Sequence, residues 1–469
     1  MGNSFVQWEA DGANSQGRGR NASLRELKQL SNLRALHLHI QDAQVMPRDM
    51  FFEKLNSYKI FIGDKWNWSS KYDLSTSRTL KLKINANNYL GHGVRTLLKM
   101  TEDLSLEGMN GVRNVLCELH EDGFPHLKHL LVQDGFELLH IVNSFTGKPA
   151  FPELESLVVR HLINLEKICH GQFNVESFSK LRILKIKKCD RLEYLFASFV
   201  AKNLTQLQEI EVIDCKNLKE IFGEESKDHG DEIETNDKID FNQLCSLTLQ
   251  RLPQFIKIGS DMRVVFPRLE NLKLCSINIE NTWLDQPLAV SSYSQCLKSL
   301  TVEECNGLKF LFSSSMVKSL NQLHKLVIGN CKSMEVIIDS KREEGEEKII
   351  DMSFPKLFSL KLKVLPKLVS FGTGNSVEFP SLNELHIDSC SNLKTFFCKS
   401  FYLDTVREEP EEEMNLENYF IDINSLFDEK VICLYTKKLC CLWQSKCCFF
   451  FFLGGCFSKL GGVGAFTLG

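Results

Sequence analysis

The chain has 469 residues, of which 43% are apolar and 25% are charged, and its formal net charge at pH 7 is −4. A chain of this length and composition can bury a large core. The small negative net charge excludes a bulk electrostatic preference for nucleic acid.

A polar segment opens the chain, and a repeating hydrophobic phrase follows it. Residues 1–20 are polar and lack the apolar stretch of a secretory signal peptide. From residue 33 to residue 393, the phrase Leu-x-x-Leu-x-(Leu/Ile/Val)-x-x-(Cys/Leu)-x-x-(Leu/Phe) recurs, as in the copy with Leu181, Leu184, Ile186, Cys189 and Leu192. Copies begin at or near Leu33, Leu55, Ser77, Thr101, Leu127, Leu154, Leu181, Leu207, Leu244, Leu269, Leu297, Leu323, Leu357 and Leu382.

Self-similarity at roughly 20–29 residues, with a short strand that carries alternate leucines, is the signature of a leucine-rich repeat solenoid. The predicted fold is therefore α/β, a curved parallel β-sheet with short helices or irregular segments on its convex side. We expect about 12–14 repeats over residues 21–400, because one unit cannot bury its apolar face alone and stacked units form a continuous core.

The repeats also recur as a set. Leu181–Phe222 aligns with Leu297–Ile338 at an offset of 116 residues without a gap, so that Cys189 falls on Cys305. This indicates growth by duplication of groups of four repeats. Two longer steps between repeats carry acidic inserts, at residues 224–240 and 341–351. Two interpretations of the inserts stay open, namely solvated loops or docking sites for a basic domain or partner.

A Phe residue precedes many of the expected strands, often with Pro after it. Examples are Phe124, Phe151, Phe266, Phe354 and Phe379. Pro is compatible with a strand entry because it has no N–H donor to lose there. We expect these Phe residues to fill the convex side of the core.

Residues between the strand leucines should point outward, because side chains in a strand alternate between its two faces. One repeat concentrates basic residues there, from Lys180 to Lys188. We predict that such positions on the concave face contact a partner; for each of them the alternative is an ordinary solvated side chain. The predicted partner-binding residues are Lys185, Lys187, Lys188, Glu211, Lys273, Lys361, Lys363 and His386.

Many of the 17 cysteines have a place in the repeat. The ninth position of the phrase, where a small buried residue faces the turn, holds Cys189, Cys215, Cys305, Cys331 and Cys390. Buried free Cys behaves as a small hydrophobe, so these residues favour a reducing compartment. Together with the missing signal peptide, they predict a cytoplasmic protein.

The end of the chain departs from the repeat. Residues 401–430 are acidic, and residues 431–469 form a tail rich in Cys, Phe and Gly. The uncharged stretch Cys447–Ser458 is shorter than the about 20 apolar residues that cross a bilayer, so no membrane span is expected. The tail has no Cys-x-x-Cys pair, which argues against a zinc site. Two interpretations of the tail stay open: a cluster of palmitoylated cysteines, or sequence that comes from a truncated or misread gene model.

Signatures of catalysis are missing from the sequence. It lacks Gly-x-x-x-x-Gly-Lys-(Ser/Thr), His-Glu-x-x-His, Gly-x-Ser-x-Gly and the protein-kinase set. The chain is therefore predicted not to be an enzyme and to use no cofactor or metal.

Several strings in the repeats resemble one family. Among them are NASLRELKQLSNLRALHLHI (Asn21–Ile40) and FPELESLVVRHLINLEKICHGQ (Phe151–Gln172), together with Met46–Ser69 and Phe178–Phe222. They resemble the repeat region of plant intracellular disease-resistance proteins of the coiled-coil, nucleotide-binding type. The resemblance covers residues 1–400, where the Cys-x-x-Leu repeat end and the Phe-Pro-x-Leu entry are combined.

The resemblance implies a role in recognition. In that family a coiled-coil domain and a nucleotide-binding switch precede the repeats, which hold the switch in its ADP state and sense a pathogen effector or a modified host protein. This chain contains neither domain, and Met1 is similar to an internal methionine of a longer parent. We therefore expect a truncated receptor, of which only the recognition part is carried over.

The predicted function is that of a sensor or autoinhibitory repeat module in plant innate immunity. Its expected partners are a pathogen effector, a guarded host protein, or a nucleotide-binding domain in cis within a longer parent or in trans. One alternative is a repeat adaptor of a ubiquitin ligase, although the 20 residues before the repeats are too few for an F-box. The other is a non-functional, unstable product, since polar caps are missing from the repeat array.

Overall fold

The computed structural model divides into two compact units, Met1–Leu297 and Lys298–Gly469. The predicted acidic segment 401–430, the N-terminal segment apart from Trp8, and most of both acidic inserts lie outside the described residues. The described residues are 8, 22–47, 52–63, 77–83, 91–109, 111–119, 122–145, 147–223, 238–259, 263–278, 295–339, 352–373, 377–398, 438–443 and 447–452.

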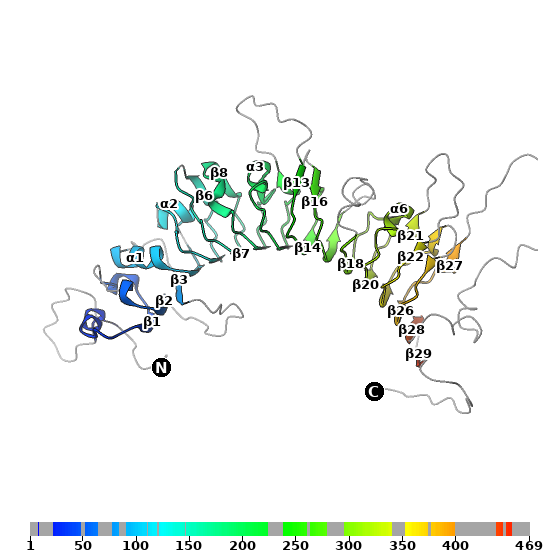
Figure 1. Ribbon diagram of the computed structural model, residues 1–469, viewed down its shortest axis with the longest axis horizontal. Coiled ribbons are helices and arrows are strands. Elements are labelled where there is room, and N and C mark those ends of the chain that lie inside the picture. Colours follow the sequence, from blue (N-terminus) through cyan, green and yellow to red (C-terminus); the bar gives the residue numbers. More distant parts are fainter. Residues whose placement is uncertain are drawn as a thin grey trace, which may run out of the picture. The chain divides into compact units, whose positions relative to one another are not determined.

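A parallel main sheet runs through the first unit (Figure 1). Its register aligns the inward leucines in columns, with Leu157 opposite Leu184 and Val159 opposite Ile186. These columns are the core that the repeating phrase predicts. The strands, in order across the sheet, are β1 (Ala35–Ile40), β2 (Ser57–Ile62), β3 (Arg78–Lys83), β4 (Asp103–Glu107), β5 (His129–Gln133), β7 (Ser156–Arg160), β9 (Ile183–Lys187), β11 (Glu209–Ile213), β14 (Ser246–Leu252) and β17 (Asn271–Ile277).

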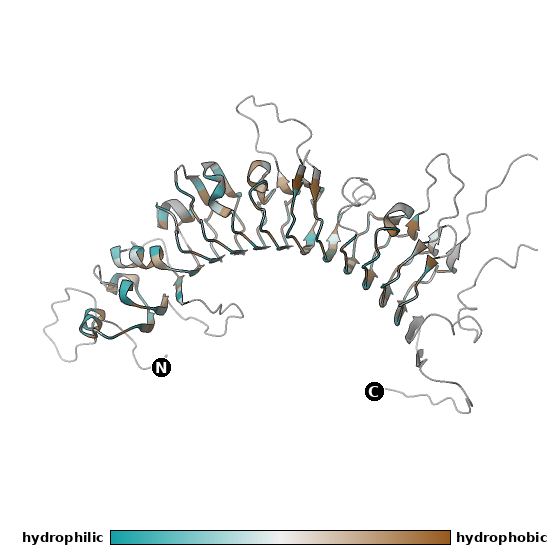
Figure 2. Ribbon diagram, in the orientation of Figure 1, coloured by the Kyte–Doolittle hydropathy of each residue, from teal (hydrophilic) through white to brown (hydrophobic). Residues whose placement is uncertain are grey.

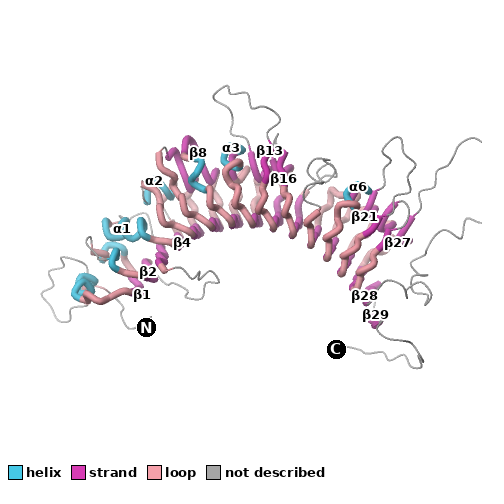
Figure 3. The backbone as a smooth tube through the Cα atoms, viewed as in Figure 1, coloured by secondary structure: helices cyan, strands magenta, loops and turns pink. Residues whose placement is uncertain are grey.

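Small parallel sheets and short helices cover the back of this main sheet (Figure 3). The helices are α1 (His92–Met100), α2 (Val115–Leu119), α3 (Ser198–Ala201) and the 3-10 turns η1 (Leu24–Gln29), η2 (Ala43–Val45), η3 (Phe52–Lys54) and η4 (Val175–Phe178). The sheets pair β6 (His140–Phe145) with β8 (Lys167–Phe173), β10 (Phe196–Ala197) with β12 (Glu220–Gly223) and β15 (Lys257–Gly259), and β13 (Lys238–Asp240) with β16 (Arg263–Val265).

The second unit has the same two layers. Its main sheet contains the parallel strands β18 (Ser299–Glu303), β20 (Lys325–Gly329), β23 (Ser359–Lys363), β26 (Glu384–Asp388) and β28 (Lys438–Trp443), and then the antiparallel β29 (Cys447–Phe452). The back layer contains α6 (Ser314–Val317), the sheet β19 (Phe312–Ser313), β21 (Val336–Asp339), β24 (Ser370–Thr373) and β27 (Thr395–Cys398), and the pair β22 (Met352–Ser353) and β25 (Val377–Glu378).

The internal alignment at an offset of 116 residues holds for the backbone as well. Five consecutive elements of the first unit, β9, β10, α3, β11 and β12, recur 116 residues later as β18, β19, α6, β20 and β21, with the same bounds. Two segments with different outward side chains therefore build the same local structure.

The Phe residues that precede the strands stack behind the main sheet, as predicted. Phe124 and Phe151 have ring centroids 5.4 Å apart and nearly parallel planes, and Phe178 follows Phe151 at 5.6 Å. In the second unit, Phe354 and Phe379 stack at 5.5 Å. All five are buried. Hydrophobic colouring accordingly appears on both layers in Figure 2.

A residue with left-handed backbone conformation lies at the carboxyl end of most main strands. Its N–H extends the sheet hydrogen bonding, as in His161 N to the Lys187 carbonyl at 2.8 Å. The ninth position comes next, and there the Cys189 thiol donates to the same Lys187 carbonyl at 3.6 Å. The left-handed residues are Gly108, Asp134, His161, Lys188, Asp214, Arg251 and Ser276 in the first unit, and Glu304, Asn330, Val364 and Ser389 in the second.

Val364 is the β-branched member of this series, with φ of 49°. Left-handed backbone costs an L-residue on the order of 1–2 kcal/mol, whereas Asn tolerates it. Val364 is 43% exposed, so little burial is lost on substitution. We expect Val364→Asn to raise the free energy of unfolding by about 1 kcal/mol, measured by urea denaturation. The matched control is Val369→Asn, because Val369 is 44% exposed and does not have a positive φ. An equal gain in the free energy of unfolding for this variant would contradict the explanation.

Candidate recognition surface

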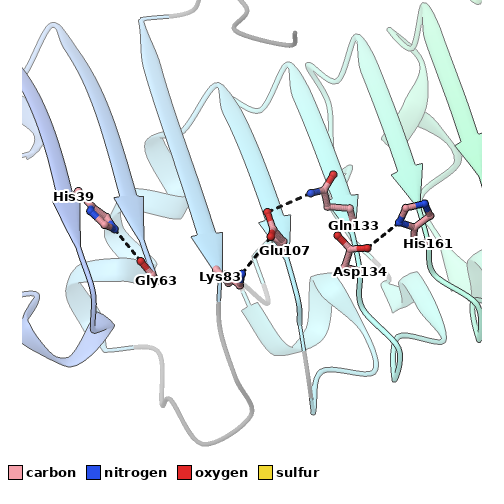
Figure 4. A network of polar contacts seen from close by, with 7 residues as sticks. All are labelled: His39, Gly63, Lys83, Glu107, Gln133, Asp134 and His161. Atoms are coloured by element: carbon pink, nitrogen blue, oxygen red, sulfur yellow. Dashed lines mark hydrogen bonds and ion pairs between the residues drawn. The ribbon is translucent and has the colours of Figure 1, made fainter. Parts of the chain in front are cut away.

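The outward face of each main sheet is the surface formed by side chains that alternate with the inward leucines. In the first unit a polar chain follows the carboxyl ends of the strands (Figure 4). Glu107 connects two neighbours, because it pairs with Lys83 at 3.4 Å and accepts a hydrogen bond from Gln133 at 3.2 Å. One repeat further, His161 Nδ1 lies 2.9 Å from Asp134 Oδ1. Cross-strand polar contacts thus fix the side chains along this edge.

The predicted residues Lys185 and Glu211 lie side by side on this face. Lys185 Nζ is 2.9 Å from Glu209 Oε1 and 3.6 Å from Glu211 Oε2, both on the neighbouring strand β11. The rest of the basic stretch is also partly neutralised, because Lys180 pairs with Glu153 at 2.7 Å. The cluster is therefore a mixed-charge surface and not a purely basic one.

Lys187 and Lys188 lie at the carboxyl end of β9, where Lys188 is the left-handed residue. Asp214 occupies the equivalent position in the next repeat and forms a bidentate pair with Arg251, with Nη2 to Oδ2 at 2.8 Å. The hydrogen bond from Arg251 is the largest cause that lowers the pKa of Asp214, and the charges of Lys187 and Lys188 lower it further. Positive charge therefore dominates this corner of the face.

The remaining predicted residues separate between the units. Lys273 lies on β17 of the first unit, opposite Thr248. Lys361, Lys363 and His386 come together in the second unit, with Lys361 directly opposite His386 in the register of β23 and β26. The structure thus brings Lys185 and Glu211 together in one unit, and these three residues together in the other.

The fold agrees with a comparison to known families. A family described as "Plant disease resistance protein RPS2-like, leucine-rich repeats" matches residues 161–278 and 268–406, which together make up more than half of the chain. The chain belongs to this family. It contains the leucine-rich repeat region of a plant resistance protein.

Curated relatives of this resistance-protein repeat region come from Arabidopsis thaliana. The probable disease resistance protein At4g27220 is 30% identical over 207 residues, which are 41% of this chain and 21% of the relative. Disease resistance protein At4g27190 is 22% identical over 240 residues, 47% of this chain and 23% of the relative. The matched part thus spans about a fifth of the length of these relatives.

Two solved structures match the chain at low sequence identity. The plant peptide hormone receptor RGFR1 in complex with RGF2 matches with a TM-score of 0.24 and 13% identity, over 80% of this chain and 65% of that chain. The TLR13–ssRNA13 complex matches with a TM-score of 0.24 and 14% identity, over 76% and 62%. The strand register described above, and not these superpositions, defines the fold.

Sequence reasoning missed the apolar part of the outward face in these resistance-protein repeats. Leu131 and Val158 lie opposite each other on neighbouring strands, and Ile183, opposite Ser156, lies on the next strand. Beside the strand ends, Phe136 is 52% and Ile163 is 41% exposed. The signal in the sequence was an apolar residue at a position between the strand leucines. Apolar residues rimmed by charges are typical of protein interfaces.

Within the described ranges, no group of three or more His, Cys, Asp or Glu residues is arranged to hold a metal ion. The helices of that part of the chain include none that is both long and apolar enough to span a bilayer.

A histidine pair lies on the back layer of the first unit. The rings of His140 and His170 stack with centroids 4.6 Å apart, and His140 Nδ1 lies 3.1 Å from Asn114 Oδ1. Burial and then the neighbouring His170 lower the pKa of His140. Burial is also the main cause that lowers the pKa of His129 and of His386. These three imidazoles therefore resist protonation in the folded state.

This predicts a loss of stability in mild acid. Below about pH 6.5 the unfolded chain binds more protons at His140 than the folded chain does. The contribution of neutral His140 to the free energy of unfolding is therefore fully present above that pH and is lost as the pH falls. We expect His140→Phe, which keeps a flat ring against His170, to reduce the difference between the urea midpoints measured at about pH 7.5 and about pH 5.5. An unchanged difference would contradict the assignment.

Proposed function

We propose that this chain is the sensor module of a cytoplasmic plant immune receptor and binds a protein partner through the outward face of its main sheets. Partner classes that fit are a pathogen effector, a guarded host protein, or a nucleotide-binding domain in cis or in trans. Binding, and not catalysis, is the proposed role. The proposed contact residues are Lys185, Lys187, Lys188, Glu211, Lys273, Lys361, Lys363 and His386.

The observation that carries the proposal is the comparison of the two duplicated segments. Inward positions keep their apolar character, since Leu184 and Ile186 of β9 correspond to Leu300 and Val302 of β18. The outward positions have changed charge or polarity. At the offset of 116 residues, the corresponding residues are Thr301 for Lys185, Glu303 for Lys187, Glu304 for Lys188, Lys325 for Glu209 and Val327 for Glu211. A constant core with a divergent face is expected of a scaffold that presents different side chains for recognition.

The duplication also supplies a test variant that keeps charge pairs matched. Five substitutions give the first unit the outward side chains of the second: Lys185→Thr, Lys187→Glu, Lys188→Glu, Glu209→Lys and Glu211→Val. Reversing Lys185 alone would leave it beside Glu209 and Glu211 as a third carboxylate. The control is Lys148→Glu at an exposed position on the back layer, which changes the net charge by the same two units as the face variant and breaks no ion pair among the described residues.

The measurement is quantitative affinity capture from extracts of infected leaves, with the full chain as bait. We expect wild type and the back-layer control to capture a common protein, and the face variant to capture it at least about tenfold less, since charged contacts decide specificity. Loss with the control, or equal capture by all three baits, would overturn the proposal. Circular dichroism and a thermal scan establish that each bait is folded.

A further inference from the structure

A lysine cluster distinguishes the outward face of the second unit. Lys361 and Lys363 lie two positions apart on β23 and so point to the same side. Lys325 lies on the neighbouring strand β20 and is exposed. Within the described residues none of these three lysines forms an ion pair. In the first unit, by contrast, Lys185 is paired with Glu209 and Glu211.

The nearby carboxylates are directed to hydroxyl groups instead. Glu384 Oε2 accepts a hydrogen bond from Ser359 Oγ at 3.1 Å, and Asp388 Oδ1 accepts one from Ser389 Oγ at 2.9 Å. His386 lies opposite Lys361, and its Nε2 is enclosed with no hydrogen-bond partner among the described residues. His386 Nε2 is therefore closed to a partner, and the donors left open by the cluster are the ammonium groups of the three lysines.

Gly329 leaves space beside the cluster. It lies opposite Lys363 on one side and Glu303 on the other, and both of these neighbours carry long side chains. A Cβ built on Gly329 would be 3.5 Å from Glu303 Cγ and 3.7 Å from Lys363 Cβ, which are ordinary contact distances. The position therefore tolerates Ala, and with Gly it leaves room for a side chain of a partner.

We propose that Lys325, Lys361 and Lys363 bind an Asp or Glu side chain presented by a protein partner, with Gly329 providing the space for its approach. This deepens the proposed function, on which it rests, by giving the charge of the partner. Nucleic acid fits less well, because Glu303 and Asp388 flank the cluster on opposite strands and would repel a continuous phosphate backbone.

The test measures binding of a fluorescein-labelled glutamate octapeptide to the full chain by fluorescence anisotropy at low ionic strength. We expect Lys361→Glu with Lys363→Glu to weaken binding at least about tenfold, and Gly329→Ala to weaken it about threefold without any change of charge. The matched control is Lys318→Glu with Lys367→Glu, which makes the same change in net charge at exposed positions outside the strands that carry the cluster. A glutamine octapeptide should not bind.

Equal affinity of the cluster variant and the control would overturn the proposal, because net charge alone would then explain binding. Tighter binding of a short single-stranded DNA that competes with the peptide would also overturn it, in favour of a phosphate ligand. Failure here is distinguishable from failure of the proposed function. The face variant that tests that function lies in the first unit and would still lose its captured protein.

Discussion

Replacing Phe354 by Ala is expected to lower the free energy of unfolding of the second unit by about 3–5 kcal/mol. Phe354 is fully buried and is the centre of an aromatic group. It stacks on Phe379 at 5.5 Å, meets Phe371 edge-on at 6.4 Å and lies 6.2 Å from Phe312. Removal of the ring leaves a cavity that several repeats share, so the neighbouring rings cannot all move in to fill it.

The control for Phe354 lies four residues away. Phe358 is 47% exposed and lies immediately before β23, and we expect Phe358→Ala to cost less than about 1 kcal/mol. Urea denaturation followed by near-ultraviolet circular dichroism measures both. Similar losses for the two variants would contradict the role of the stacked Phe residues in the core.

Gly93→Ala is expected to destabilise the first unit, although helix propensity predicts the opposite. Gly93 lies in α1, where Ala is intrinsically favoured by about 1 kcal/mol. A Cβ at this position would overlap the carbonyl oxygen of Pro47 and lie 2.7 Å from Met46 Cγ. Because the closest atom belongs to the backbone, the helix must shift, at a cost of about 1–3 kcal/mol.

Gly91, the residue before α1, provides the matched control. It has φ of −62° and nothing within 4 Å of a built Cβ. We expect Gly91→Ala to leave the urea midpoint nearly unchanged while Gly93→Ala lowers it. A higher midpoint for Gly93→Ala would show that helix propensity outweighs the close approach of α1 to Pro47.

The main sheet was predictable because its signal is periodic. Each strand is marked by two alternating apolar residues, such as Leu184 and Ile186, and stacking fixes the register between repeats. The back sheets were not predicted, since strands of two residues such as β10 and β19 are too short to show alternation. The left-handed residues were also missed, because residues as different as Asp134 and Val364 occupy that place.

The outward placement of the proposed contact residues was predictable from the sequence, but their charge pairing was not. Alternation placed Lys185, Glu211, Lys361 and His386 on outward faces, and the structure agrees. Whether a lysine is paired depends on which residue of the neighbouring repeat lies across from it. That partner is 26 residues away for Lys185 and Glu211, and the exact repeat length decides the alignment. The pairing of charges between neighbouring strands could therefore be established only from the structure.

The central claim is that the outward face binds the partner and the back layer does not. Lysine acetylation footprinting, read by mass spectrometry with and without the captured partner, tests this most directly. We expect the partner to protect outward lysines in at least one unit, namely Lys187, Lys188 and Lys273 in the first or Lys325, Lys361 and Lys363 in the second. The back-layer residues Lys148, Lys202 and Lys318 should be modified equally in both samples. Protection confined to the three back-layer lysines would contradict it.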